Sequence, residues 1–155
     1  MYSNDLVINL LNYIDNNINK KITMDELSHI FYFNKDYLMR IFKKELDITI
    51  MDYINKLRIY NSLEDIKNTS DMMIKIALNN GYSSQEYFTE TFTKIIGVSP
   101  LIYRKFTKVN SQISEHELDL IRRSLAELSS TINRISRYKT NVIPTNPTKK
   151  FTFFK

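Results

Sequence analysis

The most informative stretch of this chain is residues 76–104, IALNNGYSSQEYFTETFTKIIGVSPLIYR. The pattern predicts a short apolar helix, a turn at Gly81, and a second helix that ends at Gly97. Gly81 and Gly97 are the only two glycines of the chain, and glycine suits a turn with a positive φ. The apolar residues of the second helix recur at helical spacing: Tyr87, Phe88, Phe92, Ile95 and Ile96.

Polar residues at the helix ends support this assignment. Ser83 or Ser84 can accept a hydrogen bond from the free N–H groups that open the second helix. Ser99 and Pro100 then begin a further helix. Helix, tight turn and helix is the unit that places a helix in a DNA major groove, and the same hairpin can also serve only to support a core.

The composition favours helices and excludes several classes of site. The chain has 155 residues, 43% hydrophobic and 25% charged, with three prolines and no cysteine, so no disulfide, thiol nucleophile or zinc–thiolate site is expected. His29 and His116 lack the spacing of a metal or catalytic pair, so we expect no metal, no cofactor and no enzyme activity. No run of about 20 apolar residues exists and the N-terminus is acidic, which predicts a soluble cytoplasmic protein without a membrane segment.

The positive charge is unevenly distributed along the chain. The net charge is +5, yet residues 1–106 contain 13 Lys/Arg and 13 Asp/Glu, while residues 107–155 contain 9 and 4. Any nucleic-acid binding by the first part must therefore come from the local arrangement of charges, because its overall field is weak.

Upstream of residue 76 the same architecture is predicted a first time. Thr23 and Glu26 form a capping-box pattern, and Asn34 precedes a helix over 35–46. The expected helices lie at 5–17, 24–31, 35–46, 50–67 and 72–79, the last capped by Ser70 or Asp71. The sequence thus predicts an all-α domain over 1–106: a first helix-turn-helix subdomain at 1–48, a long connecting helix at 49–67 and a second subdomain at 68–106, both homeodomain-like bundles. Two recognition helices on one connector can reach adjacent major grooves, about 34 Å apart.

Many positions of residues 5–106 agree in order and spacing with one family. They are Asn34, Tyr37-Leu38, Arg40, Phe42-Lys43-Lys44, Tyr53, Leu57, Arg58, Ile76-Ala77, Gly81-Tyr82, SQEYFTETF at 84–92, Gly97, Ser99-Pro100 and Tyr103-Arg104. This pattern resembles the DNA-binding domain of AraC/XylS-family transcription regulators. The resemblance implies binding to asymmetric double-stranded DNA sites and activation of transcription through contact with RNA polymerase.

By position, the resemblance implies which side chains meet DNA. Base-facing residues would be Asp36, Met39 and Arg40 in the first recognition helix and Gln85, Glu86, Thr89 and Glu90 in the second. Phosphate contacts would come from Lys35, Lys43, Lys94 and Arg104. We expect Arg40 to be the main base contact, because a guanidinium can bind guanine through two hydrogen bonds.

Several positions depart from the family pattern. Glu90 stands where Arg or Lys is usual, Asp36 where an uncharged residue is common, and Glu86 shares a helix face with Glu90. These carboxylates repel phosphates, although they can accept a hydrogen bond from cytosine. Asp47 and Tyr32 occupy positions where glycine is expected, after the third helix and before it.

The tail is predicted as a linker at 107–113, an amphipathic helix at 114–138 and a basic extended segment at 139–155. The helix has a heptad pattern of apolar residues: Leu118, Ile121, Leu125, Leu128, Ile132 and Ile135. This face can form a homodimer or fold back onto the preceding domain, and the pattern favours neither.

The sequence therefore predicts a sequence-specific DNA-binding transcription regulator, more specifically an activator, with its DNA-binding domain at the N-terminus and no upstream ligand-binding domain. The alternative is a family member impaired in DNA binding that acts by protein–protein interaction through the C-terminal helix. The neutral charge of residues 1–106 and the acidic second recognition helix motivate that alternative.

Overall fold

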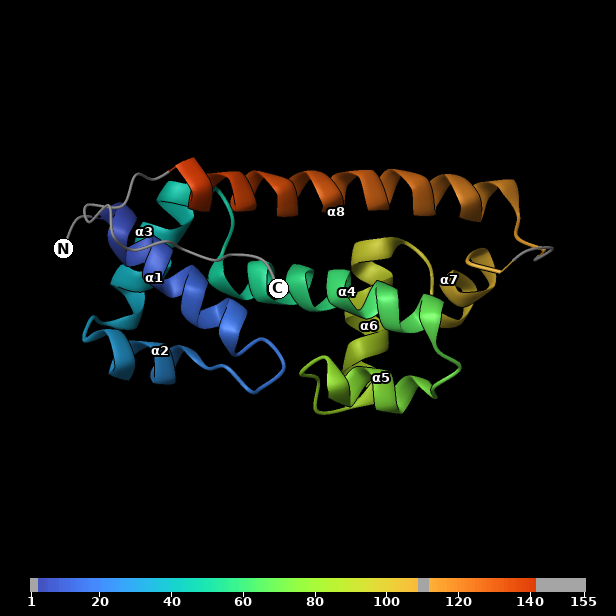
Figure 1. Cartoon of the computed structure of the whole chain (residues 1–155), viewed down its shortest axis with the longest axis horizontal. Coiled ribbons are helices and arrows are strands. Elements are labelled where there is room, and N and C mark those ends of the chain that lie inside the picture. Colours follow the sequence, from blue (N-terminus) through green and yellow to red (C-terminus); the bar gives the residue numbers. More distant parts are fainter. Residues whose placement is uncertain (1–2, 109–111, 142–155) are drawn as a thin grey trace.

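The computed structural model describes residues 3–108 and 112–141, and this part of the chain contains helices and no strand (Figure 1). The helices are α1 (Ser3–Asn16), α2 (Met24–Phe31), α3 (Lys35–Leu46), α4 (Ile50–Asn68), α5 (Met73–Asn79), α6 (Gln85–Ile96), α7 (Pro100–Phe106) and α8 (Glu115–Asn141). The predicted all-α fold with two helix-turn-helix units is confirmed. Of the predicted linker at 107–113 the structure describes 107–108 and 112–113, which lie between α7 and α8. Of the predicted basic extended segment at 139–155 it describes 139–141, and these correct the prediction because they form the end of α8. The predicted domain limits otherwise stay predictions.

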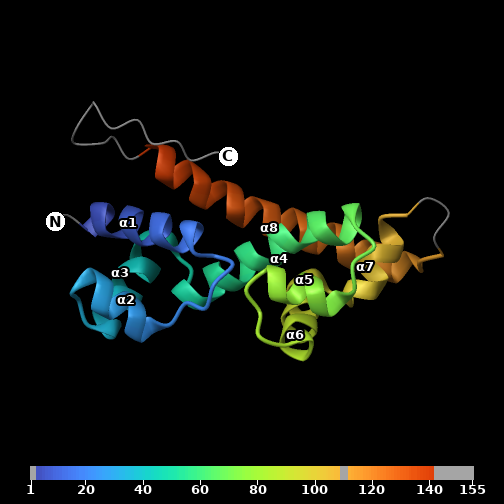
Figure 2. The ribbon, with the colours of Figure 1, turned by 60° about the horizontal axis from the view of Figure 1, so that its bottom comes forward.

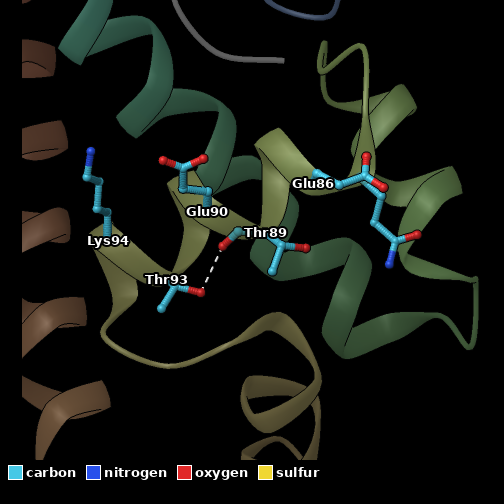
Figure 3. Close-up of a pocket in the computed structure, with 6 residues that line it drawn as sticks. Glu86, Thr89, Glu90, Thr93 and Lys94 are labelled. Atoms are coloured by element: carbon cyan, nitrogen blue, oxygen red, sulfur yellow. Dashed lines mark hydrogen bonds between the residues drawn. The ribbon is translucent and has the colours of Figure 1, made fainter.

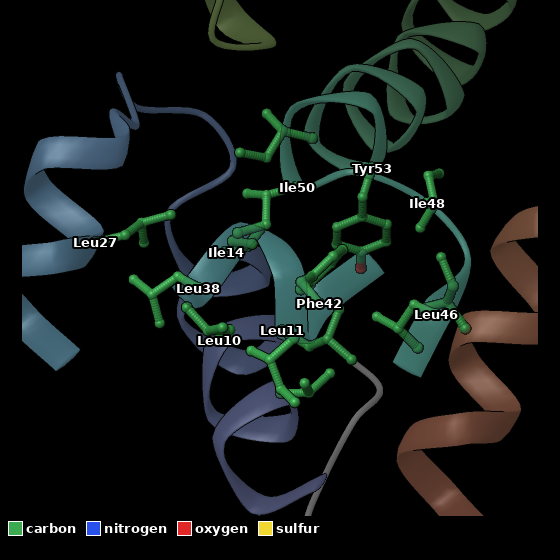
Figure 4. Packing of buried hydrophobic residues seen from close by; sticks show 14 of the residues in the cluster. Leu10, Leu11, Ile14, Leu27, Leu38, Phe42, Leu46, Ile48, Ile50 and Tyr53 are labelled. Atoms are coloured by element: carbon green, nitrogen blue, oxygen red, sulfur yellow. The ribbon is translucent and has the colours of Figure 1, made fainter. Parts of the chain in front are cut away.

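The first unit consists of α1, α2 and α3 packed on the N-terminal half of α4. Its core is shown in Figure 4. The predicted inner face of α3 is confirmed, because Leu38, Ile41, Phe42 and Leu46 are all buried. From α4 the unit takes Tyr53, whose ring packs on that of Phe42 at a centroid distance of 6.0 Å.

The second unit consists of α5, α6 and α7 packed on the C-terminal half of α4. A row of aromatic rings runs through it, in which neighbouring rings from Tyr82 through Phe88 and Phe92 to Tyr103 lie 5.4–5.7 Å apart. On α6 the side chains of Phe88, Phe92 and Ile96 are buried, as predicted. Tyr87 is 46% exposed, which corrects its assignment to the apolar face.

Polar caps begin the helices where the sequence places them, with one exception. Asn34 and Ser84 accept from the backbone N–H groups of Tyr37 and Tyr87, at 2.8 and 3.1 Å. The start of α5 was predicted wrongly: Met72 precedes it without a side-chain cap.

The other polar residues near these helix starts have different partners. Asp71, one of the two residues expected to cap α5, forms an ion pair with Lys75 at 3.3 Å. Thr23 caps α2 as expected, but the carboxylate of Glu26 accepts from the Tyr13 hydroxyl at 2.8 Å. The Glu26 side chain is thereby used to tie α2 to α1.

Residues with a left-handed backbone lie in the turn of each helix-turn-helix hairpin and at the end of each recognition helix. Gly81 and Gly97 have φ values of +86° and +91°, as the turn assignment requires. Tyr32 and Asp47, which stand where the family pattern has glycine, also have positive φ values of 60° and 54°. The backbone is therefore left-handed at both positions, although neither holds glycine, the residue that adopts this conformation most easily.

Helix α8 lies alongside both units, as Figures 1 and 2 show from two directions. Ile135 is buried in the first core, and Ile121 and Leu128 are buried in the second. Of the two arrangements that the heptad pattern leaves open, the structure has the helix folded back onto the domain. Among the helices of the described residues, none has a stretch apolar and long enough to cross a bilayer.

Candidate nucleic-acid interface

The outer face of α3 carries all the residues that the sequence assigns to DNA in the first unit. Its members are exposed: Lys35, Asp36, Met39, Arg40 and Lys43. They are brought together because the opposite face of the same helix is locked into the first core. The helix is anchored at its start by the Asn34 cap, so the first turn has a defined position.

Arg40 is held over an aromatic stack. Its guanidinium carbon lies 5.6 Å from the centre of the Tyr37 ring, and Tyr37 stacks on Phe33 at 5.0 Å with an interplanar angle of 27°. A guanidinium on an aromatic face keeps its planar N–H groups available at the edge. The stack therefore limits the conformations of Arg40 while leaving it exposed.

The lysines of α3 have acidic neighbours. Lys35 pairs with Asp25 of α2 at 2.7 Å, and this hydrogen bond and charge raise the pKa of Lys35. Lys43 lies 3.8 Å from Asp47. Exposed pairs of this kind are weak because water screens them, so a phosphate can replace the carboxylate.

The outer face of α6 is polar and mostly exposed (Figure 3). It presents Gln85, Glu86, Thr89, Glu90, Thr93 and Lys94, which together line one open depression. Thr93 was not among the predicted site residues, and its hydroxyl donates to the Thr89 carbonyl oxygen at 2.8 Å. The face has two carboxylates and one cation, so it is less suited to phosphates than α3.

Arg104 lies on α7 instead of on a recognition helix. Its guanidinium donates to the carbonyl oxygens of Ile66 and Thr69, at 3.3 and 3.4 Å. Those carbonyls belong to the C-terminal end of α4. The structure therefore gives Arg104 a connection within the second unit.

Lys56 of α4 is a cation that the sequence analysis missed. It lines, together with Lys94 of α6 and Glu127 of α8, a depression between these three helices. Nothing in the sequence marks it, because the connecting helix reads as a core element and its outer face becomes visible only when α6 and α8 are in place.

The residues predicted as possible dimer contacts all lie on α8, and most face the domain. Ile121, Leu128 and Ile135 are buried, Leu125 and Ile132 pack on the second core, and Leu118 is half-buried. A dimer through this face would require α8 to leave the domain. Among the residues with defined positions, no three His, Cys, Asp or Glu side chains form a group able to hold a metal ion.

Comparison with known proteins finds the same domain. Residues 27–105 match the model of a helix-turn-helix domain family. The chain is 32% identical over 108 residues to the uncharacterized HTH-type transcriptional regulator YbfP of Bacillus subtilis, covering 70% of this chain and 37% of that protein. It is 26% identical over 103 residues to the HTH-type transcriptional activator AarP of Providencia stuartii, covering 66% and 76%.

A solved structure agrees with these relatives. The C-terminal domain of AraT, a response regulator from Geobacillus stearothermophilus, superposes with a TM-score of 0.64 at 28% identity, over 72% of this chain and 93% of that one. The family model covers both recognition helices and the connecting helix, while α8 lies outside it. The chain belongs to the AraC-type family of helix-turn-helix transcription regulators.

Proposed function

We propose that this chain is a sequence-specific DNA-binding transcription regulator that inserts α3 and α6 into adjacent major grooves. The observation that carries the proposal is the pair of helix-turn-helix units on one connecting helix, each with its recognition helix buried on one face and polar on the other. Such a pair reads two base sequences at a fixed separation.

The first unit is the stronger reader in this proposal. Arg40, held on Tyr37, is suited to bind the O6 and N7 atoms of guanine through two hydrogen bonds. Asp36 and Met39 flank it on the same exposed face. Lys35 and Lys43 then contact phosphates, which sets the position of the helix without selecting a sequence.

The second unit is proposed to bind DNA more weakly, because Glu86 and Glu90 on its outer face repel phosphates. Gln85 is suited to adenine, Thr89 to the thymine methyl group, and Glu86 or Glu90 to the amino group of cytosine. Lys94 supplies the phosphate contact of this helix. Arg104 was expected to do the same, but its guanidinium already binds the end of α4, so we place it second to Lys94.

Activation is proposed as the direction of regulation. The support is the resemblance to AarP, which is named an activator. RNA polymerase is the partner that an activator of this kind contacts. If the DNA-binding domain covers 1–106, α8 and the basic segment have other roles. The matched part of this chain covers 37% of the length of the Bacillus subtilis relative. The match therefore bears on the DNA-binding domain, and activation by the whole protein is part of the proposal.

The alternative role, protein–protein interaction through α8, has less support. It needs the apolar face of this helix, and that face is packed on the cores of the same chain. A homodimer through the same face of α8 would also require this packing to open.

Selection of bound sequences from random duplex DNA tests the proposal. We expect one enriched sequence with two conserved blocks, and an Arg40→Ala variant should bind it about 5- to 150-fold more weakly and accept other bases at one position. Lys44→Ala, on an exposed position of the same helix, is the control and should leave the sequence preference unchanged. No enriched sequence, or unchanged binding by Arg40→Ala, would exclude α3 as the reader.

A further inference from the structure

Both recognition helices end against α8. At the end of α3, the Arg134 guanidinium donates to the carbonyl oxygen of Leu46, the last residue of that helix. At the end of α6, Gly97 lies so close to α8 that a Cβ atom there would be 3.3 Å from the Leu120 Cβ and from the Ser124 Oγ. Helix α8 thus contacts the C-terminal ends of both recognition helices, α3 and α6.

The two points of contact are separated by a rigid length of helix. Leu120 and Arg134 are fourteen residues apart within the uninterrupted α8. At 1.5 Å per residue this is about 21 Å. A continuous helix of this length keeps the ends of α3 and α6 at a constant separation.

The attachment of α8 to the first unit combines Ile135, which is buried in the first core, with specific polar contacts. Lys139 forms an ion pair with Asp15, and both side chains are largely buried, at 13% and 28% exposed. The same carboxylate accepts from the Tyr53 hydroxyl at 2.7 Å. Tyr138 adds a hydrogen bond to Glu45 of α3 at 3.3 Å. These contacts fix the direction in which α8 crosses the first unit.

The attachment to the second unit is apolar. Ile121 and Leu128 are 0% and 2% exposed and belong to the core that contains α6. Apart from α8, the two units share α4, and the loop after α1 lies against both Arg58 of α4 and the turn at Gly81 of the second unit. In Figure 1 that loop lies on the side of α4 opposite to α8, so the units are pinned from two sides.

We propose that α8 is a brace that determines spacing specificity: it fixes the separation and orientation of the two recognition helices, so that the protein accepts operators with one distance between their two sequence blocks. This rests on the proposed function. Since α8 lies outside the family match at 27–105, the brace is an addition to the shared domain. Two recognition helices in one rigid body bind poorly to DNA whose sequence blocks have another spacing, because one helix then loses its base contacts.

The test removes the two cations of the polar attachment and measures binding at two spacings. The brace variant is Arg134→Ala with Lys139→Ala, and the control is Arg122→Ala with Arg137→Ala, which removes the same charge from exposed positions of the same helix. Each is bound to the selected duplex and to one with two base pairs inserted between the blocks, a rotation of about 70°. Wild type and control should lose roughly 100-fold on insertion, and the brace variant less than about 10-fold.

A second measurement does not depend on DNA. The chain has no cysteine, so Asn9→Cys on α1 and Asn79→Cys on α5 allow two spin labels at exposed sites, one per unit. The distance distribution should be narrow in wild type and control and broad in the brace variant. If the double variant does not fold, Arg134→Gln alone takes its place in both measurements.

Equal widths and equal spacing selectivity in all proteins would overturn the brace. If no DNA sequence is enriched at all, the proposed function fails while the distance measurement still decides whether α8 holds the two units together.

Discussion

Arg58 donates from its Nε to the carbonyl oxygen of Ile18 at 3.0 Å, forty residues earlier in the chain. Its Nη2 donates to the Lys20 carbonyl oxygen at 2.7 Å, and its guanidinium lies 5.7 Å from the centre of the Tyr82 ring. The residue is buried by this arrangement, with 7% of its surface exposed. One cation therefore joins the loop after α1, the connecting helix and the turn of the second unit.

Replacing Arg58 with alanine should lower the free energy of unfolding by about 2–3 kcal/mol. The loss combines two hydrogen bonds from a charged group with carbonyl oxygens left without their partner. Urea denaturation measures it, and Arg137→Ala, at an exposed position of α8, should change the value by less than about 0.5 kcal/mol. Equal effects of the two substitutions would contradict a structural role for Arg58.

Gly81→Ala should destabilise the protein more than Gly97→Ala. Both glycines have positive φ values, but a Cβ on Gly81 would lie 2.6 Å from the Ile18 carbonyl oxygen and 2.8 Å from the Arg58 Nε. At Gly97 the nearest atoms are 3.3 Å away. We expect a cost of about 1 kcal/mol at Gly97 and at least about 2 kcal/mol at Gly81, measured as the shift in the urea midpoint. The reverse order would show that the Gly81 contact can relax.

Glycine should stabilise the chain at the two left-handed positions that lack it. Tyr32 is 92% exposed at φ 60°, so Tyr32→Gly removes backbone strain and little packing. We expect the free energy of unfolding to rise by about 0.5–1 kcal/mol in Tyr32→Gly and by a similar amount in Asp47→Gly. Lys44→Gly within α3 is the matched control and should lose about 1 kcal/mol. A loss at Tyr32 and Asp47 would mean that their side chains contribute more than the strain costs.

Stability should fall above pH 10 because buried tyrosines must remain protonated. Burial and the nearby Glu45 carboxylate raise the pKa of Tyr138 to about 12. Burial and Asp15 raise the pKa of Tyr53 further. A tyrosine whose pKa is raised in the folded state contributes stability below its unfolded pKa of about 10 and loses it as pH rises to the folded value.

Urea denaturation between pH 8 and 11.5 measures this effect. Tyr138→Phe should reduce the decline above pH 10, whereas Tyr60→Phe, at an exposed tyrosine, should leave the profile unchanged. An identical decline in the Tyr138→Phe variant would assign the alkaline loss to other groups.

Asp25→Asn should strengthen DNA binding. The substitution removes the carboxylate that pairs with Lys35 at 2.7 Å. The Lys35 ammonium can then bind a phosphate without first giving up its contact with Asp25. We expect a roughly two- to fivefold lower Kd at low salt. Asp119→Asn, which removes an equal charge from the Arg123 pair on α8, separates this effect from net charge. The same gain in both variants would refute a direct contact by Lys35.

Local signals predicted most of the helices and their ends. Asn34, Ser84 and Ser99 cap the helices they precede, because a cap depends on one side chain and the next turn of backbone. The cap of α5 was wrong because Asp71 bonds to Lys75 instead. Short-range rules cannot choose between two local partners of similar energy.

The connecting helix shows the limit of periodicity. Tyr53 and Ile54 belong to the first core, while Ile59 and Ile66 belong to the second. Because α4 turns different faces to two units, its apolar residues do not form one stripe, and the burial of Arg58 cannot be read from the pattern. The same applies to Lys56, whose surroundings come from α6 and α8.

Most features of this domain can be read from its residues without a structure: the helices, the two turns at Gly81 and Gly97, the exposed faces of α3 and α6, and the family. These depend on contacts within a few residues, or on motifs that carry their spacing along the chain. The position of α8, in contrast, follows only from the folded chain. Its heptad face fits a second copy or its own domain equally well as a pattern. The choice depends on pairs distant in sequence, such as Lys139 with Asp15 and Arg134 with Leu46.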